Sequence, residues 1–126
     1  MSTNNESNRE NHYQQGTEHY FAKRYEDAII TLTQAITLNP DDKLAFDRRG
    51  SAYKSLKQFD LALQDYNRAL EIDSTFDNAY RNRAHVFRHT NLYRAAIADF
   101  ERAKKYNPHH HDVIDKWIQA LQDKLT

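Results

Sequence analysis

Apolar residues recur along this chain with the period of an α-helix. In the middle of the sequence, Phe59, Leu63, Tyr66 and Leu70 are spaced at i, i+4, i+7 and i+11. This spacing places the four side chains on one face of a helix and predicts that the face is buried. The chain contains only two glycines and two prolines, so few positions interrupt its helical segments.

A second apolar stripe lies near the end of the chain. Its members are Val113, Ile114, Trp117, Ile118, Leu121 and Leu125. The polar residues between them lie largely on the opposite side of the predicted helix. We expect a helix over about 111–125 whose apolar face covers the end of the fold, and we interpret Trp117 as a packing residue of that cap.

Matched residues also recur at a spacing of 34. The aligned columns are Tyr25, Phe59 and Tyr93; Ala28, Ala62 and Ala96; Leu32, Tyr66 and Phe100; Ala35, Ala69 and Ala103; and Gly16, Gly50 and Ala84. The last column holds small residues, as two closely crossing helices require. Since each copy contains two helical stretches, the repeat predicts three copies of one helical hairpin.

The predicted architecture is all-α, with three helical hairpins closed by a seventh helix. The repeats are about 9–42, 43–76 and 77–110, with first helices near 9–22, 43–56 and 77–90 and second helices near 25–38, 59–72 and 93–106. Residues 1–8 are polar throughout, and we predict a disordered tail there before one domain over 9–126. Pro40 and Pro108 end the second helices, because proline lacks an N–H. Ser74 takes that place in the middle repeat, where we expect a less sharp end.

This pattern resembles the tetratricopeptide repeat, a 34-residue helix–turn–helix with small residues, alanines, an aromatic and a terminal proline at set places. The resemblance covers about residues 9–110. The family's Trp position holds His12, Phe46 and Tyr80, its Leu position Gln15, Arg49 and Arg83, and its Tyr position His19, Tyr53 and Phe87. The resemblance implies hairpins stacked into a right-handed superhelix whose first helices line a concave groove.

Register carries the family's groove positions onto this chain. The resulting peptide-binding candidates are Tyr13, Thr17, Tyr20, Phe21, Arg48, Ser51, Lys54, Asn78, Arg81, Asn82, His85, Arg88 and His89. The same register includes Glu10, Gln14, Leu44, Asp47 and Ser55. Four of these residues are Arg or Lys and two are acidic, whereas the whole chain is neutral with 18 basic and 18 acidic residues. Positive charge is therefore concentrated in the predicted groove.

The groove composition suggests a partner. Arginine is well suited to bidentate recognition of carboxylates. The aromatic residues Tyr13, Tyr20 and Phe21 add an apolar end to the same surface. We expect a protein-interaction module or scaffold that binds an extended, acidic peptide segment with an apolar anchor. The alternative interpretation is a set of ordinary solvated helix charges.

Cochaperone members of the family hold the C-terminal carboxylate of chaperones with a clamp of Lys, Asn, Asn, Lys and Arg. The corresponding positions here are Tyr13, Thr17, Arg48, Asn78 and Asn82. None of them matches, so we do not expect chaperone tails to be held in that form. Asn78 and Asn82 lie four apart on one helix and are candidates for bonding a peptide backbone, because a carboxamide both donates and accepts.

Two other classes of function stay open. Outward apolar residues such as Ile30 and Leu61 would suit a self-associating structural element. His85 and His89 have the i, i+4 spacing of metal ligands, but no third ligand is indicated, so we predict no metal site and no cofactor. The His109–His111 run follows a proline, and we expect its side chains to diverge in a solvated loop.

The remaining features argue against several classes of protein. There is no cysteine, no glycine-rich phosphate loop and no specific metal motif, so we predict no enzymatic activity. RNA binding would need a longer basic track than four groove cations provide. The longest apolar runs span about four residues, far fewer than a membrane helix needs. We expect a cytoplasmic protein that binds neither nucleic acid nor membrane.

Overall fold

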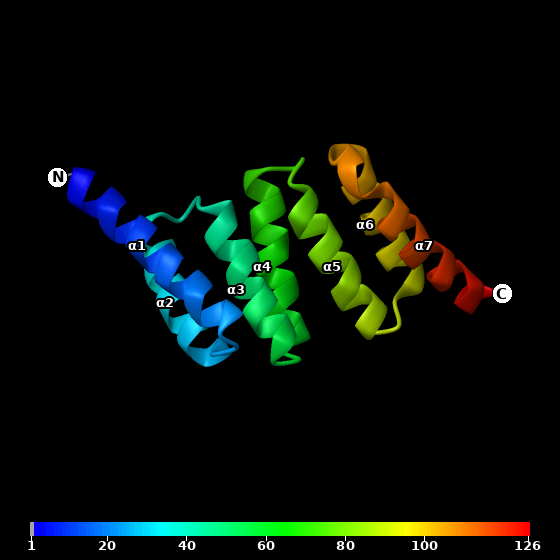
Figure 1. Cartoon of the computed structure of the whole chain (residues 1–126), viewed down its shortest axis with the longest axis horizontal. Helices are drawn as coiled ribbons and strands as arrows, with labels where there is room; N and C mark the ends of the chain where they lie inside the picture. Colours follow the sequence, from blue (N-terminus) through cyan, green and yellow to red (C-terminus); the bar gives the residue numbers. More distant parts are fainter. Residues whose placement is uncertain (1) are drawn as a thin grey trace.

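The computed structural model describes residues 2–126, and within them the side chains of residues 10–109 and 111–126. This part of the chain is all-α and contains no strand. Its elements are α1 (Ser2–Phe21), α2 (Tyr25–Leu38), α3 (Lys43–Ser55), α4 (Phe59–Ile72), α5 (Asp77–His89), α6 (Tyr93–Tyr106), the 3-10 turn η1 (Pro108–His110) and α7 (His111–Leu125). They follow one another along the long axis of the molecule, with the two termini at opposite ends (Figure 1).

The helix bounds agree with the periodicity to within one residue except at the start of the chain. There, α1 begins at Ser2, so residues 2–8 are helical where a disordered tail was expected. Met1 lies outside the described residues. No glycine or proline precedes Gly16. Once the packed part of α1 has formed, each further turn therefore adds backbone hydrogen bonds without a residue that breaks the helix.

The two helices of each hairpin are joined by a tight turn of the same design. Lys23, Lys57 and Asn91 occupy it with φ values of 62°, 61° and 65°, and they are spaced by the repeat length of 34. In the second hairpin, the N–H of Gln58 donates to the Tyr53 carbonyl at 2.9 Å and closes the end of α3. This left-handed residue reverses the chain within three residues and sets the first helix against the second.

An Asx turn that follows each second helix also recurs at a spacing of 34. The residues Asn39, Asp73 and Asn107 each accept the backbone N–H two positions on, at 3.2, 3.0 and 3.0 Å. The helix α4 therefore ends at Ile72 with the same backbone geometry as its counterparts. The prediction of a less sharp end at Ser74 is wrong, because the Asx turn stops the helix without a proline.

Close crossing of the helices in each hairpin depends on the small-residue column. A Cβ added at Gly16 would lie 2.6 Å from Leu32 Cγ, and one at Gly50 would lie 2.9 Å from Tyr66 Cε1. Leu32 and Tyr66 are themselves completely buried. The packing role predicted for these columns is confirmed.

The helix α7 covers the end of the array. Ile114, Ile118 and Leu121 are buried against a cluster that includes Phe100, and Trp117 is partly buried beside it. The charged residues of α7 remain on the exposed side. The predicted capping role of this helix is confirmed.

Arginine at the family's leucine position has a structural explanation in the second repeat. Arg49, on α3, makes two bonds to the Asp65 carboxylate of α4, Nε to Oδ2 at 2.8 Å and Nη2 to Oδ1 at 2.7 Å. Its Nη1 donates to Thr33 Oγ1 of α2 at 3.0 Å. One guanidinium therefore joins three consecutive helices.

The third repeat contains the same arrangement 34 residues later. Arg83, on α5, bonds Asp99 of α6 through Nε at 2.6 Å and Nη2 at 2.9 Å, and donates from Nη1 to Asn67 of α4 at 2.8 Å. Hydrogen bonding to Asp99 raises the pKa of the Arg83 guanidinium. In the first repeat these positions hold Gln15 and Thr31, and Thr31 bonds the carbonyl of Asp27 in its own helix. The tie is therefore present in two of the three hairpins.

Candidate functional site

The first helices of the three hairpins form a continuous surface. α1 contacts α3, and α3 contacts α5, so residues on these helices share one side of the molecule (Figure 1). We call this surface the first-helix face. All of the predicted groove residues belong to these three helices. They are Tyr13, Thr17, Tyr20 and Phe21 on α1; Arg48, Ser51 and Lys54 on α3; and Asn78, Arg81, Asn82, His85, Arg88 and His89 on α5.

At the α1 end of this face, an arginine lies against aromatic rings. The Arg48 guanidinium carbon is 5.3 Å from the centre of the Tyr20 ring and 5.0 Å from that of Phe21. Phe21 is 68% exposed, so this aromatic surface faces solvent. The buried Nε of Arg48 has no hydrogen-bond partner among the described residues. The rings orient this cation, and its two Nη groups make no hydrogen bond to a described residue.

Three further cations gather between α3 and α5. Burial lowers the pKa of the Lys54 ammonium, and the positive charges of Arg81 and Arg88 lower it further, against the opposing effect of Asp47. None of the three cations forms an ion pair within the described part of the chain. Their mutual repulsion would be relieved by a bound anion. We call Lys54, Arg81 and Arg88 the cationic cluster.

Two asparagines lie beside the cationic cluster, each with half of its carboxamide in use. Asn78 Oδ1 accepts a hydrogen bond from Arg81 Nη2 at 2.8 Å, and Asn82 Nδ2 donates to Asp47 Oδ1 at 3.1 Å. Burial raises the pKa of the Asp47 carboxyl, and this hydrogen bond opposes the shift. The NH₂ of Asn78 and the carbonyl of Asn82 remain free to bond a peptide backbone.

Two predicted groove hydroxyls lie deeper than the cations. Ser51 is only 5% exposed, and its Oγ lies 2.9 Å from the Tyr66 hydroxyl. Its hydrogen-bonding capacity is therefore partly used inside the fold, which the register alone does not reveal. Thr17 has a buried Oγ1 without a described partner. Neither hydroxyl oxygen is therefore a readily accessible contact on the first-helix face.

The two groove histidines lie against aromatic rings in different places. The ring of His85 meets Trp117 edge-on at 4.6 Å and Phe100 at 5.1 Å, whereas His89 is stacked on Phe59 at 6.0 Å. Among the described residues, no group of three or more His, Cys, Asp or Glu side chains is placed to hold a metal ion. Nothing in this geometry favours the metal-binding alternative.

The other residues singled out from the sequence lie away from this face. Ile30 and Leu61 are 60% and 40% exposed on the second helices α2 and α4. His109 is exposed, while His111 lies with Nε2 3.1 Å from the Lys104 carbonyl. The side chain of His110 lies outside the described residues. Isolated apolar side chains of this kind are common on soluble proteins and do not by themselves indicate self-association.

The environment of His85 predicts a pH-dependent stability. Burial, followed by the charges of Lys54, Arg88 and Arg81, lowers its pKa to about 3. An unfolded histidine binds its proton near pH 6.5. Below that pH the unfolded state is protonated and the folded state is not, so stability is lost as the pH falls toward 3. We expect the free energy of unfolding to fall by at most roughly 2 kcal/mol between pH 6.5 and pH 5, because solvent screens part of the effect.

The measurement for this prediction is urea unfolding at pH 7.5, 6 and 5 for the native chain and for His85→Gln. The variant carries no titrating group at this position, so its stability should fall less steeply with pH. Equal slopes for the two proteins would assign the acid sensitivity to other residues.

Comparison with known proteins identifies the fold. A family model described as "Tetratricopeptide repeat" matches residues 10–42 and 78–110, which together exceed half of the chain, and one described as "TPR repeat" matches residues 50–91. The chain belongs to the tetratricopeptide repeat family. No helix of this family member within residues 2–126 is both long and apolar enough to cross a membrane.

Curated relatives contain this repeat region within longer proteins. Serine/threonine-protein phosphatase 5 of Homo sapiens is 35% identical over 106 residues, covering 84% of this chain and 21% of the phosphatase. Hsp70-Hsp90 organizing protein 2 of Arabidopsis thaliana is 26% identical over 109 residues, covering 86% of this chain and 19% of that protein. The chain thus spans about a fifth of the length of these tetratricopeptide repeat proteins.

Solved structures show the same arrangement of helices. The TPR domain of Arabidopsis OM64 has a TM-score of 0.85 and 28% identity, covering 92% of this chain and 98% of that one. The first TPR domain of Spaghetti (RPAP3), bound to the HSP90 peptide SRMEEVD, has a TM-score of 0.89 and 22% identity, with 94% of each chain covered. The helices of this chain are therefore arranged as in solved tetratricopeptide repeat domains.

Proposed function

We propose that this chain binds an extended, acidic segment of a partner protein along the first-helix face. The observation that carries the proposal is the difference between two sets of cations. Arg49 and Arg83 are committed to carboxylates inside the fold. The groove cations Arg48, Lys54, Arg81 and Arg88 form no ion pair with any described residue. Unpaired, partly buried cations on one face favour an anionic ligand.

The aromatic end of the face supports an apolar anchor within the same segment. The exposed ring of Phe21 and the partly buried ring of Tyr20 contact each other at 5.3 Å, edge to face. Aromatic residues of this kind are enriched at the centres of protein interfaces. The free carboxamide groups of Asn78 and Asn82 would bond the main chain of an extended segment. The proposal assigns the chain a binding role and no catalytic one.

A peptide complex of a structurally similar TPR domain supports the proposal of an acidic ligand. The HSP90 peptide bound to the first TPR domain of Spaghetti, SRMEEVD, contains two glutamates and an aspartate. In this chain the positions of the carboxylate clamp hold Tyr13, Thr17, Arg48, Asn78 and Asn82. We therefore propose recognition of acidic side chains rather than of a chaperone's terminal carboxylate.

The cationic cluster can be tested by charge reversal. The chain and its Arg81→Glu/Arg88→Glu variant are each used to select binders from a random peptide library. We expect the native chain to enrich Asp and Glu together with an apolar residue. The affinity of those peptides for the variant should fall at least about tenfold, because two charge-assisted contacts become repulsive.

The matched control is Arg94→Glu/Lys105→Glu, which makes the same change in net charge at exposed positions on α6. This control should bind like the native chain. Selected peptides without an acidic excess, or equal binding to the Arg81/Arg88 variant, would contradict the proposal. Amidating the C-terminus of a selected peptide should change its affinity little; a large loss would indicate recognition of a terminal carboxylate.

A further inference from the structure

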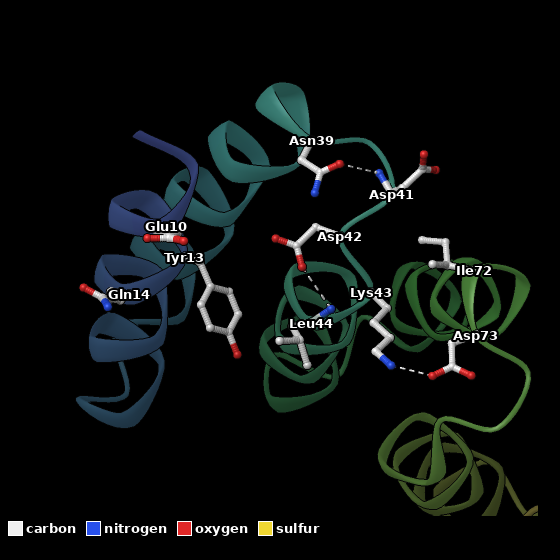
Figure 2. A pocket seen from close by; sticks show the side chains of 10 residues that line it. All are labelled: Glu10, Tyr13, Gln14, Asn39, Asp41, Asp42, Lys43, Leu44, Ile72 and Asp73. Atoms are coloured by element: carbon white, nitrogen blue, oxygen red, sulfur yellow. Dashed lines mark hydrogen bonds and ion pairs between the residues drawn. The ribbon is translucent and has the colours of Figure 1, made fainter. Parts of the chain in front are cut away.

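An open pocket lies at the start of α3, ten residues along this helix from Lys54 of the cationic cluster. Its volume is about 690 Å³, and it lies between α1, the α2–α3 connection, the start of α3 and the end of α4. Its lining residues are Glu10, Tyr13, Gln14, Asn39, Asp41, Asp42, Lys43, Leu44, Ile72 and Asp73 (Figure 2). Only Glu10, Tyr13, Gln14 and Leu44 belong to the groove register. The others are brought there by the stacking of the hairpins.

The pocket has apolar side chains at its centre. Figure 2 shows Tyr13 projecting from α1 into the space beside Leu44, which lies at the start of α3. Leu44 lines the pocket and is 45% exposed. Ile72 closes the far side from the end of α4. An aliphatic stem of a ligand would have apolar contacts on these walls.

The charges around the pocket are mostly negative. Four carboxylates line it against one ammonium, that of Lys43. Lys43 is bound to Asp73, whose pKa is lowered to about 2 by the hydrogen bonds from Lys43 and Thr75, so this carboxylate remains ionised and its partner is neutralised. Asp41 contacts Arg68 at 3.2 Å, while Glu10 has no ion-pair partner among the described side chains. The pocket therefore favours a cation.

The arrangement of these carboxylates suits an organic cation better than a metal ion. No three of the described acidic or histidine side chains converge closely enough to hold a metal. Asp42 Oδ1 already accepts the N–H groups of Leu44 and Ala45 at 3.1 and 3.2 Å. Its other oxygen makes no hydrogen bond to a described residue, and Figure 2 shows it on the side of the carboxylate that faces α1. Lysine and arginine side chains combine an aliphatic stem with a charged tip, which matches apolar walls with an acidic rim.

We propose that this pocket receives a lysine or arginine side chain of the partner segment, with its stem on Tyr13 and Leu44 and its charge at Glu10 and Asp42. This inference rests on the proposed function, because it assigns a second contact to the same bound segment. The segment would then carry opposite charges at its two ends and bind in one direction. The pocket thereby determines both specificity and orientation.

The length of α3 gives the spacing between the pocket and Lys54, the α3 residue of the cationic cluster. Leu44 and Lys54 are separated by ten residues of α3, a length of roughly 15 Å at the α-helical rise. An extended peptide advances by about 3.3–3.6 Å per residue. The partner's basic residue should therefore lie about four to five residues from its acidic residues. A basic residue directly beside them would not reach both sites.

The test uses two synthetic peptides that differ at one position. The first has a lysine, four Gly/Ser residues and then Glu-Leu-Glu-Leu-Glu, and the second has glutamine in place of the lysine. The pocket variant is Glu10→Gln/Asp42→Asn, in which asparagine preserves the helix cap of α3. The matched control, Asp60→Asn/Glu101→Gln, removes two exposed carboxylates from the second helices α4 and α6.

We expect the native chain and the control to bind the lysine peptide about two- to fivefold more tightly than the glutamine peptide. The pocket variant should bind both peptides with the weaker affinity. If the pocket variant retains the preference for lysine, or weakens both peptides equally, the pocket assignment is wrong. A lysine placed directly beside the glutamates should give no preference; equal tightening by this peptide would overturn the spacing.

The same experiment separates the two proposals. Binding of both peptides that is lost in Arg81→Glu/Arg88→Glu but unaffected by the pocket variant would leave the cationic groove and remove the pocket's role. Failure of the native chain to bind either peptide, or equal binding by the Arg81/Arg88 variant, would contradict the proposed function itself.

Discussion

Replacement of Arg83 by leucine should lower the free energy of unfolding by about 3 kcal/mol or more. The side chain of Asp99 is only 1% exposed, and it would lose the two bonds from Arg83 at 2.6 and 2.9 Å. Its one remaining ionic contact is Arg102 Nη1 at 2.7 Å, from a side chain that is half exposed. A buried carboxylate with so little compensation strongly disfavours the folded state.

A double-mutant cycle separates the favourable energy of the Arg83–Asp99 ion pair from the cost of leaving the buried Asp99 carboxylate unpaired. In Arg83→Leu/Asp99→Leu both charges are replaced by apolar groups, so most of the stability should return. The control Arg68→Leu removes an arginine whose partners Asp41 and Glu71 are exposed, and it should cost no more than about 1 kcal/mol. Urea unfolding is measured for the native chain, the single variants Arg83→Leu and Asp99→Leu, the double variant and the control. A double variant as unstable as the sum of its singles would refute the explanation.

Substitution of Gly50 by valine is expected to destabilise the chain by about 3 kcal/mol, at the upper end of the usual overpacking cost. The new Cβ would lie 2.9 Å from Cε1 of Tyr66 and 3.2 Å from Cβ of Asp65. Tyr66 is completely buried and lies 2.9 Å from Ser51 through its hydroxyl, so its ring has little room to move. The helices α3 and α4 would have to separate.

Thermal unfolding of a graded set measures this effect. Gly50→Ala should lower the melting temperature less than Gly50→Val. Alanine makes a smaller clash than valine, and its helix propensity, about 1 kcal/mol better than that of glycine, offsets part of the cost. Ala84→Gly provides the control in the third repeat, where alanine is already accommodated at the equivalent position. It should be destabilised by about 1–2 kcal/mol, from the lower helix propensity of glycine and the lost burial of the Ala84 methyl group. An unchanged melting temperature in Gly50→Val would show that the hairpin can open without cost.

The helices could be predicted well because their information is local and repeated. Tyr25, Phe59 and Tyr93 begin second helices exactly one repeat apart, and the observed helices α2, α4 and α6 start at these residues. Burial of Leu32 and Phe100 follows from the same register. Residues of similar size that recur every 34 positions indicate both a helix and the helix that packs against it. Three copies of the repeat therefore predict how the hairpins stack.

The polar contacts between helices could not be predicted in the same way. Arg49 and Arg83 depart from the family's leucine, and nothing at their own positions shows that Asp65 and Asp99 lie opposite them. The signal was a second recurrence: each arginine has an aspartate sixteen residues later. Ser51 illustrates the converse, since its groove register is correct but its hydroxyl lies against Tyr66.

The pocket escaped prediction for a related reason. It combines Glu10 and Leu44, which belong to the groove register, with residues from the α2–α3 connection and the end of α4. Those segments are separated by most of a repeat in sequence. Only the stacked hairpins place Asp42 and Asp73 around the same space, so the acidic rim depends on tertiary structure rather than on periodicity.

The uneven distribution of the arginine ties implies a gradient of stiffness along the array. Arg49 and Arg83 each hold three helices in register with directional bonds, whereas Gln15 and Thr31 provide no equivalent tie in the first hairpin. The spacing between α3 and α5 is therefore preorganised, while α1 depends on less directional packing. A partner segment bound as proposed would contact the preorganised helices α3 and α5 and would restrict the motion of α1 relative to them.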